Sequence, residues 1–230
     1  MGTIGIIGAM DEEVELLLNK MKDKNEITVA GTLFITGNLE NRDVVLLKSG
    51  IGKVNAAMAT TIMHERFAPS CVINTGSAGG FAQDLNVGDI VVSNQVVHHD
   101  VDVTAFDYAY GQVPGMPPMF ASDPKLISLT VEAAKNFNVH VRQGSIATGD
   151  SFMSDTERVA FVKNKFPGLL AAEMEAAAIA QVCYQYKCPF IVIRALSDIA
   201  GKDSSVSFDL FLNQAAKHAA LLIIGVVRHL

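Results

Sequence analysis

The chain has 230 residues, half of them hydrophobic, and a formal net charge of −6. This length and composition fit one domain over residues 1–230 with a large core. The negative charge and the lack of a basic cluster argue against nucleic acid as a partner, because binding of phosphates needs grouped Lys and Arg. We therefore expect a globular protein that acts on a small molecule.

No pattern typical of export or membrane insertion is present. The longest purely apolar run near the C-terminus covers residues 219–224, far short of the ~20 residues that span a bilayer. No basic residue precedes the apolar residues 4–7, and acidic residues follow them, unlike a secretory signal. We expect a cytoplasmic protein without a membrane segment.

The cysteines and the hydropathy add two expectations. Cys71, Cys183 and Cys188 show neither CxxC spacing nor a histidine pattern, which argues against disulfides and zinc. We expect reduced core thiols. The mean hydropathy of +0.29 is high for a soluble chain and indicates apolar surface that a homo-oligomer would cover.

The first segment predicts a buried strand over residues 3–9 and an amphipathic helix over 10–21. The acidic residues 11–13 fall in the first helical turn, where the simplest interpretation is a favourable interaction with the helix dipole. The glycine spacing in residues 2–8 differs from the GxGxxG fingerprint, so we expect no nicotinamide site.

Three strand-like pieces follow at residues 27–30, 33–37 and 43–49, before a helix over 54–65. The sequence SGIGK (49–53) resembles part of a phosphate-binding loop. However, Val54 follows Lys53, and the first glycine of that motif is missing. We therefore expect no nucleoside triphosphate site.

A glycine-rich segment follows the next apolar strand, residues 71–75. In TGSAGG (75–80), glycines allow backbone amides to approach a ligand and Ser77 offers a hydroxyl, although an ordinary turn would look the same. A strand over 88–98 leads into a long loop, residues 98–120, of a kind that is usually functional or disordered. The His98-His99-Asp100 triplet suggests a metal, but adjacent side chains on an extended segment point oppositely, so we expect no metal site.

The next elements are a helix over 125–137, a strand over 141–148 and a helix over 156–165. Phe152 follows the end of that strand, so it fits either a stacking platform for an aromatic ligand or a core position. The last predicted helix covers residues 207–229.

The stretch from residue 169 to 201 contains the most suggestive carboxylates. It predicts a helix over 172–186 and a strand over 190–196, interrupted by Arg194. Glu173 and Glu175 would be about 200° apart on that helix, so both cannot face one ligand. One of them can face inward; the alternative for either is a solvated helix face or an interaction with the helix dipole in the first turn.

Asp198 follows the carboxyl end of the predicted strand, where parallel sheets bind ligands. Burial can raise the pKa of an aspartate from ~3.9 by roughly 3–5 units, which would make it a proton donor. Alternatively, Asp198 caps the next turn or pairs with Arg194. The order of elements predicts a three-layer α/β/α single domain with a mixed, partly barrel-like central sheet.

Seven segments, in order and at family spacing, closely resemble the 5′-methylthioadenosine/S-adenosylhomocysteine nucleosidases of the purine nucleoside phosphorylase-like superfamily. They cover nearly the whole chain: GIIGAMDEEV (5–14), LLKSGIGKVNAA (46–57), INTGSAGG (73–80), VTAFDYAYGQVPG (103–115), ATGDSF (147–152), EMEAAAIA (173–180) and RALSDIA (194–200).

The resemblance implies a nucleoside phosphorylase-like fold and hydrolysis of the N-glycosidic bond of adenine thioribosides, without cofactor or metal. The products are adenine and methylthioribose or S-ribosylhomocysteine, and 5′-deoxyadenosine is a further expected substrate. Asp198 matches the general acid on adenine N7, and Glu13 the base that activates water. Glu175 matches the residue that holds the ribose hydroxyls, with the backbone of Met174 beside it.

The resemblance also implies several other substrate contacts. Phe152 would stack on adenine and the backbone of Met153 would read its edge, although the family often has isoleucine there. The remaining lining residues are Ser77, Gly79 and Ser197, with Met10, Ile51 and Phe208 as apolar walls. Members are homodimers in which the partner chain completes the 5′-thioalkyl pocket, and the matching residues here are Val103, Phe106, Tyr108 and Pro114.

Two alternatives stay open at this point. A purine nucleoside phosphorylase of the same fold would need cationic phosphate ligands near the first glycine turn, where this chain has three carboxylates, so charge favours hydrolysis. A binding protein without catalysis would saturate with nucleoside but would not turn it over.

Overall fold

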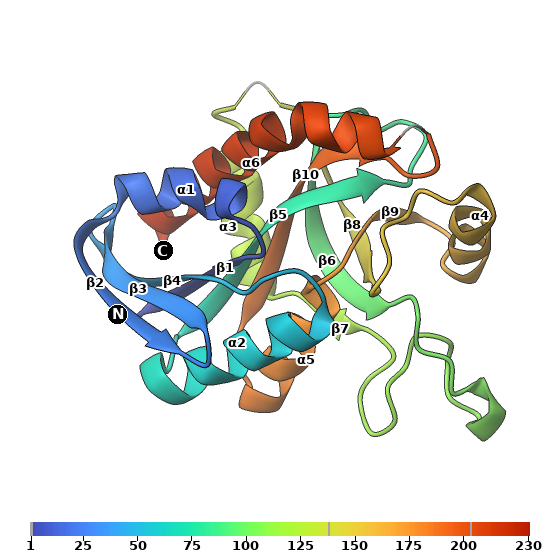
Figure 1. Ribbon diagram of the computed structural model, residues 1–230, viewed down its shortest axis with the longest axis horizontal. Helices are drawn as coiled ribbons and strands as arrows, with labels where there is room; N and C mark the ends of the chain where they lie inside the picture. The colour runs from blue at the N-terminus through green and yellow to red at the C-terminus, as the bar shows by residue number, and fades with distance from the viewer. Residues whose placement is uncertain (1, 138, 203) are drawn as a thin grey trace.

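A ten-stranded mixed sheet forms the centre of the computed structural model, which describes residues 2–137, 139–202 and 204–230 (Figure 1). The strands are β1 (Ile4–Gly8), β2 (Lys22–Val29), β3 (Thr32–Leu39), β4 (Arg42–Lys48), β5 (Cys71–Gly80), β6 (Ile90–His98), β7 (Phe120–Ala121), β8 (Val141–Thr148), β9 (Leu169–Glu173) and β10 (Phe190–Ile199). The helices are α1 (Asp11–Lys20), α2 (Lys53–Phe67), α3 (Pro124–Ala134), α4 (Thr156–Lys165), α5 (Ala176–Tyr186) and α6 (Ser204–His229), with the short 3₁₀ helix η1 (Thr104–Phe106).

Part of this sheet closes into a ring. Strand β5 pairs with β10, β10 with β6, β6 with β8, and β8 with β9, which returns to the end of β5. The β10/β6 and β5/β9 pairs are antiparallel and the others in the ring are parallel. Strands β1, β4, β3 and β2 extend the sheet outward from β5. The prediction of a mixed, partly barrel-like sheet is confirmed.

Helices cover both faces of the sheet, which confirms the predicted three layers. Helices α1, α3 and α6 lie on one face, and α2 and α5 on the other (Figure 1). Neighbouring residues of one strand contribute to opposite cores: Ile193 packs with α6, whereas Val192 packs in the core that contains α2 and α5. Coverage on both faces explains why β1 is buried along its whole length.

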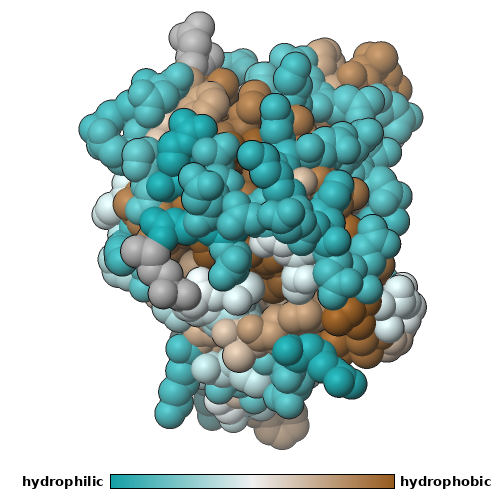
Figure 2. Space-filling model, turned by 90° about the vertical axis from the view of Figure 1, so that its left-hand side faces the viewer, coloured by the Kyte–Doolittle hydropathy of each residue, from teal (hydrophilic) through white to brown (hydrophobic). Residues whose placement is uncertain are grey.

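Strand β2 forms the outer edge of the sheet and is largely exposed. It begins with the charged residues Lys22, Asp23 and Lys24, and the side of the molecule that carries it is largely hydrophilic (Figure 2). Charged residues on an edge strand oppose pairing with another chain.

Among the described residues, α6 is the one helix that is long and apolar enough, by length and composition alone, to cross a bilayer. Half of its most apolar stretch is buried inside the fold, where Ala219, Leu222 and Val226 belong to the core beneath β10. We interpret α6 as a core helix, because core helices of globular domains can be equally long and apolar.

Most predicted elements are present, and residues 141–148 and 156–165 form β8 and α4 with the predicted bounds. The prediction of a helix beginning at residue 172 is wrong, because residues 169–173 form β9 and the helix begins at Ala176. Pairing of β9 with β8 and β5 closes the ring, and this non-local interaction overrides the helix preference of Leu, Ala and Glu. Strand β5 also continues through TGSAGG to Gly80, and β10 continues to Ile199.

Candidate active site

A cavity of about 370 Å³ lies where β1, β5, β9 and β10 reach their carboxyl ends. Ile51, which precedes α2, the segment 151–153 after β8, and the first turns of α6 complete its walls. The location agrees with the general position of ligand sites beyond the carboxyl ends of parallel strands.

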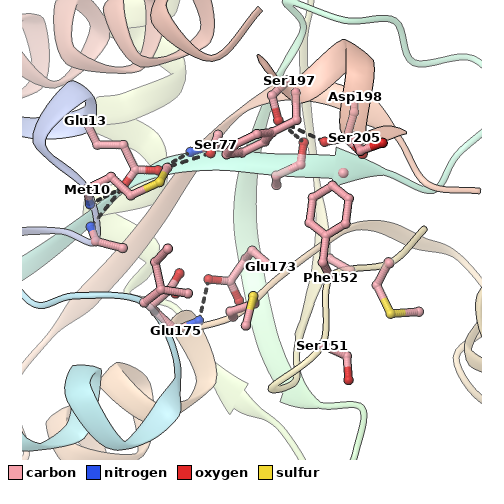
Figure 3. A pocket seen from close by; sticks show the side chains of 18 of the residues that line it. Met10, Glu13, Ser77, Ser151, Phe152, Glu173, Glu175, Ser197, Asp198 and Ser205 are labelled. Atoms are coloured by element: carbon pink, nitrogen blue, oxygen red, sulfur yellow. Dashed lines mark hydrogen bonds between the residues drawn. The ribbon is translucent and has the colours of Figure 1, made fainter. Parts of the chain in front are cut away.

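Glu13 is fixed in the cavity by the start of α1 and by β5. Its Oε2 accepts hydrogen bonds from the backbone N–H groups of Ala9 (2.8 Å) and Met10 (3.2 Å). Its Oε1 accepts from the N–H (2.9 Å) and the hydroxyl (3.1 Å) of Ser77 (Figure 3). A glutamate in the first turn that reaches back to the N-terminal backbone is a common helix cap. Here the same contacts hold a buried carboxylate, 2% exposed, in one orientation.

Arg194 is a fully buried cation beneath this site. Its Nη2 donates to the Glu173 carboxylate, to Asn74 Oδ1 at 2.8 Å and to Glu175 Oε2 at 3.5 Å. Its Nη1 donates to two backbone carbonyls of β5. A Cβ at Gly76, where φ is +151°, would lie 2.1 Å from Nη1, so glycine is required for the guanidinium to fit.

Glu173 and Glu175 have different surroundings although they are two residues apart. Glu173 accepts from the N–H groups of Glu175 and Ala176, each at 2.9 Å, and from the Thr148 hydroxyl, so it caps α5 and holds Arg194. Glu175 Oε1 accepts from Gly52 N–H at 2.9 Å. Burial, followed by repulsion from Glu173, raises the pKa of Glu175, while Arg194 opposes the shift.

Asp198 reaches the cavity through a β-bulge in β10. The pairing with β5 joins Leu196 to Ala78 and Asp198 to Gly79, so Ser197 is the extra residue. Bulges bend a strand and change where the following side chain points. Asp198 is 3% exposed and accepts a hydrogen bond from Ser197 Oγ at 2.9 Å. Burial raises the pKa of Asp198 to about 6, against the opposing effect of the Ser197 hydroxyl.

The side of the cavity near Asp198 carries aromatic and apolar groups. Phe152 and Phe208 contact each other edge to face, with ring centroids 5.8 Å apart, and Phe152 is 41% exposed. The Met153 side chain is buried, and its carbonyl accepts a hydrogen bond from Gly201 N–H at 3.1 Å. In Figure 3, Phe152 lies beside Asp198 and Ser205, across the open space from Glu13.

The ionisable side chains among the described lining residues are all acidic: Glu13, Glu173, Glu175, Asp198 and Asp209. Arg194 lies behind them and is already paired with carboxylates. The cavity therefore offers an environment that favours cations and disfavours anions.

Residues 3–228 match the family model described as the phosphorylase superfamily. The 5′-methylthioadenosine/S-adenosylhomocysteine nucleosidase of Oceanobacillus iheyensis is 64% identical over 226 residues, which are 98% of this chain and 99% of that protein. This chain belongs to the 5′-methylthioadenosine/S-adenosylhomocysteine nucleosidase family. The resemblance found in the sequence is thereby confirmed.

Solved nucleosidase structures agree over the whole chain. The enzyme from Neisseria meningitidis in complex with methylthio-immucillin-A has a TM-score of 0.98 and 47% identity, with all of both chains covered. The enzyme from Streptococcus pneumoniae with a transition-state inhibitor has a TM-score of 0.95 and 40% identity, with 98% of each chain covered.

The structure brings the residues predicted for nucleosidase catalysis and substrate binding together in the lining of one cavity. They are Glu13, Asp198, Glu175, Met174, Ser77, Gly79, Phe152, Met153, Met10, Ile51, Ser197 and Phe208. Glycine at position 79 has a clear steric reason, because a Cβ there would lie 3.1 Å from Asp198 Oδ2. The roles of these residues in the nucleosidase reaction stay predictions.

The residues predicted to complete a partner's pocket are not part of this lining. Val103, Phe106, Tyr108 and Pro114 lie in the long segment between β6 and β7, and Phe106 is 74% exposed. Such exposure of an aromatic ring fits a surface that another chain covers. Their contribution to a nucleosidase dimer stays a prediction.

Sequence analysis did not predict how the charged residues of the nucleosidase site are paired. Glu173 and Glu175 were expected to face apart on a helix, but both are buried and both contact Arg194. The alternative of an Asp198 pair with Arg194 is wrong, since Ser197 is the partner of Asp198 and the carboxylates of residues 173 and 175 bind the guanidinium. One charge in an otherwise apolar strand was the available signal, because a buried cation needs buried anions. The lining also includes Ala9, Ala78, Ser151, Ala172, Ser205 and Asp209.

The His98-His99-Asp100 triplet has other contacts. His98 Nε2 lies 3.1 Å from Gln181 Oε1, and Asp100 binds Lys53 Nζ at 2.7 Å. Within the described ranges, no group of three or more His, Cys, Asp and Glu side chains is arranged to hold a metal ion. The cysteines are free thiols; two of them are buried as predicted and Cys188 is partly exposed.

Proposed function

We propose that the protein hydrolyses the N-glycosidic bond of 5′-methylthioadenosine and S-adenosylhomocysteine, as a single nucleosidase domain over residues 1–230. The products are adenine and methylthioribose or S-ribosylhomocysteine, and 5′-deoxyadenosine is a further substrate. The observation that carries the proposal is the pair of buried carboxyl groups, Asp198 and Glu13, on opposite sides of one cavity (Figure 3). The volume of about 370 Å³ falls within the usual range for small-ligand sites, roughly 300–1,000 Å³.

Asp198 is the general acid in this proposal. With a pKa of about 6 it is protonated in about one tenth of free molecules at pH 7, whereas an ordinary aspartate is almost wholly ionised. It donates its proton to adenine N7 as the bond between C1′ and N9 breaks, so the base leaves as neutral adenine. Proton transfer from a placed side chain contributes roughly 10²–10⁴-fold to the rate.

Glu13 is the base. It takes a proton from the water whose oxygen forms the new bond to C1′. Glu13 then releases that proton to solvent and Asp198 takes one up, which restores both groups for the next turnover. Its hydrogen bonds to Ser77 and to the start of α1 support a fixed orientation towards that water. The carboxylates around the cavity also stabilise the positive charge that develops on the sugar in an oxocarbenium-like transition state.

Substrate contacts follow from the same arrangement. Glu175 accepts the ribose hydroxyls, with the backbone of Met174 beside it, and Phe152 stacks on adenine. The backbone of Met153 contacts the edge of the base. The sugar and the thioalkyl group lie against Met10, Ile51 and Phe208, with Ser77, Gly79 and Ser197 completing the wall.

Hydrolysis is favoured over phosphorolysis by charge. Phosphate would enter a cavity whose described lining residues have only acidic ionisable groups, and like charges at short distance repel. The test is adenine release from each nucleoside with and without phosphate. Hydrolysis predicts equal rates and a free reducing sugar, whereas a phosphorylase would need phosphate and yield a sugar 1-phosphate.

The same assay separates catalysis from simple binding. A binding protein would saturate with methylthioadenosine and release no adenine, and that result would refute the proposed activity.

We also propose a cytoplasmic homodimer that serves methionine salvage and the activated methyl cycle. In the dimer, Val103, Phe106, Tyr108 and Pro114 of one chain complete the 5′ end of the other chain's site. The exposure of Phe106 supports this arrangement. Sedimentation analysis of the wild type and of Phe106→Asp tests it, since a charge in a buried interface should yield monomers with reduced affinity for methylthioadenosine.

A further inference from the structure

Three segments that are distant in the sequence meet in a closed set of hydrogen bonds beside the cavity. Lys53 N–H donates to Asp150 Oδ1 at 2.8 Å, and Asp150 N–H donates to Asp100 Oδ2 at 3.0 Å. Lys53 Nζ donates to Asp100 Oδ1 at 2.7 Å, which closes the set. We refer to these residues as the Lys53–Asp100–Asp150 ring.

Each member of the ring adjoins a segment with a part in the site. Lys53 is the first residue of α2 and follows the turn that carries Ile51. Asp150 directly precedes the lining residues 151–153, and Asp100 is the second residue of the long segment between β6 and β7. The ring therefore ties the Ile51 wall, the Phe152 wall and the base of the long segment to one another.

The ring also bears on Glu175 through the start of α2. The cap residue Gly52 has no side chain to satisfy the first N–H groups of the helix, and two carboxylates from elsewhere do so instead. Asp150 accepts from Lys53 N–H, and Glu175 accepts from Gly52 N–H. A shift of the start of α2 would therefore move the partner that orients Glu175.

The charges favour the closed ring. The side chains of Lys53 and Asp100 are 21% and 28% exposed, so their attraction is only partly screened by solvent. Burial opposes ionisation of Asp100, but its bonds to Lys53 and to Asp150 N–H outweigh that effect and hold its pKa below the ordinary value.

We propose that Lys53, Asp100 and Asp150 are positioning residues that set the spacing between the two substrate-contacting walls of the nucleosidase site. None of them lines the described cavity, so they act through Ile51, Phe152 and Glu175. The inference rests on the proposed function, because affinity for methylthioadenosine is its readout. Turnover by the wild type tests that function, whereas the ring is tested only by the differences between variants.

The experiment compares paired substitutions at two members of the ring. Asp150→Ala removes the acceptor for Lys53 N–H, whereas Asp150→Asn keeps an acceptor oxygen. Lys53→Met removes the ammonium, whereas Lys53→Arg keeps a cationic donor. Lys135→Met is the matched control, since it breaks an exposed ion pair with Glu132 on α3, away from the cavity.

Asp150→Ala and Lys53→Met should each raise KM for methylthioadenosine about 10-fold, the effect of roughly 1.4 kcal/mol, with kcat changed less than threefold. Asp150→Asn, Lys53→Arg and Lys135→Met should stay within threefold of the wild type. The proposal is overturned if KM is unchanged in both disruptive variants, or if each conservative variant is as impaired as its disruptive partner. A purely structural role would lower the melting temperature without this separation of KM from kcat. If Asp150→Ala does not fold, the two Lys53 variants decide.

Discussion

Asp198→Asn separates the chemical role of the buried acid from its effect on the fold. Asparagine has almost the same size and its carbonyl can still accept the hydrogen bond from Ser197 Oγ, which is 2.9 Å long with aspartate. An amide cannot donate a proton of the required acidity. We therefore expect kcat for methylthioadenosine to fall by roughly 10²–10⁴-fold, with KM within threefold of the wild type.

The same substitution should stabilise the protein above pH 6. Burial raises the pKa of Asp198 from 3.8 to about 6, so the native state binds this proton more tightly than the unfolded state does. That contribution to stability is fully present below about pH 4 and is lost as the pH rises through about 6. The difference between the two pKa values corresponds to about 3 kcal/mol of folding free energy that the wild type loses as the pH rises. The asparagine variant does not titrate here and has no such loss.

Two measurements check the prediction for Asp198. Adenine release at saturating substrate gives kcat, and denaturant unfolding at pH 4, 6 and 8 gives the free energy of unfolding of both proteins. The stability of the variant relative to the wild type should rise with pH and level off above about pH 6. A kcat within threefold of the wild type would refute the catalytic assignment, and a variant that loses stability relative to the wild type at pH 8 would refute the electrostatic reasoning.

Three further substitutions test other parts of the site. Glu13→Gln removes the base and replaces one acceptor oxygen by an NH₂ group that faces N–H donors. The value of kcat should fall at least 100-fold, and the free energy of unfolding should fall by about 1–3 kcal/mol. Single-turnover kinetics and denaturant unfolding check this, and a normal kcat would contradict it. Glu175→Gln should raise KM as well as lower kcat, because the contact of Glu175 with the ribose hydroxyls acts in the ground state too. Normal values of both constants in steady-state kinetics would show that Glu175 does not bind the substrate. Gly79→Ala places a Cβ 3.1 Å from Asp198 Oδ2 and should lower kcat/KM about 10-fold with little change in melting temperature, and an unchanged kcat/KM would show that Asp198 has room to shift.

Local sequence patterns predict the elements whose stability comes from their own periodicity and caps. Asp155 caps α4 through Arg158 N–H at 2.8 Å, and the predicted bounds of that helix are those of the structure. Strand β10 is apolar enough to require cover on both faces, which indicates a parallel sheet before any topology is known. The position of Asp198 at its carboxyl end was predictable for the same reason.

Strand β9 could not be predicted, because its conformation depends on partners distant in the sequence. Its residues prefer a helix when considered alone, and only pairing with β8 and β5, which closes the ring of strands in the sheet, makes them a strand. The misplaced helix start also hid the distinction between Glu173, which holds Arg194 and caps α5, and Glu175, which contacts the start of α2. The resemblance to the family identified Glu175, but not the buried cation that binds it.

The acidic lining has a consequence for inhibitors. A nucleoside analogue with a permanently cationic ring in place of ribose would lie in the cavity that Glu13 and Glu175 line, and should bind more tightly than its neutral counterpart. An analogue with a sulfonate or phosphonate at that position would be repelled by the same carboxylates and should bind more weakly. For this nucleosidase, the sign of the charge on the ribose-like ring of an inhibitor should therefore affect its affinity.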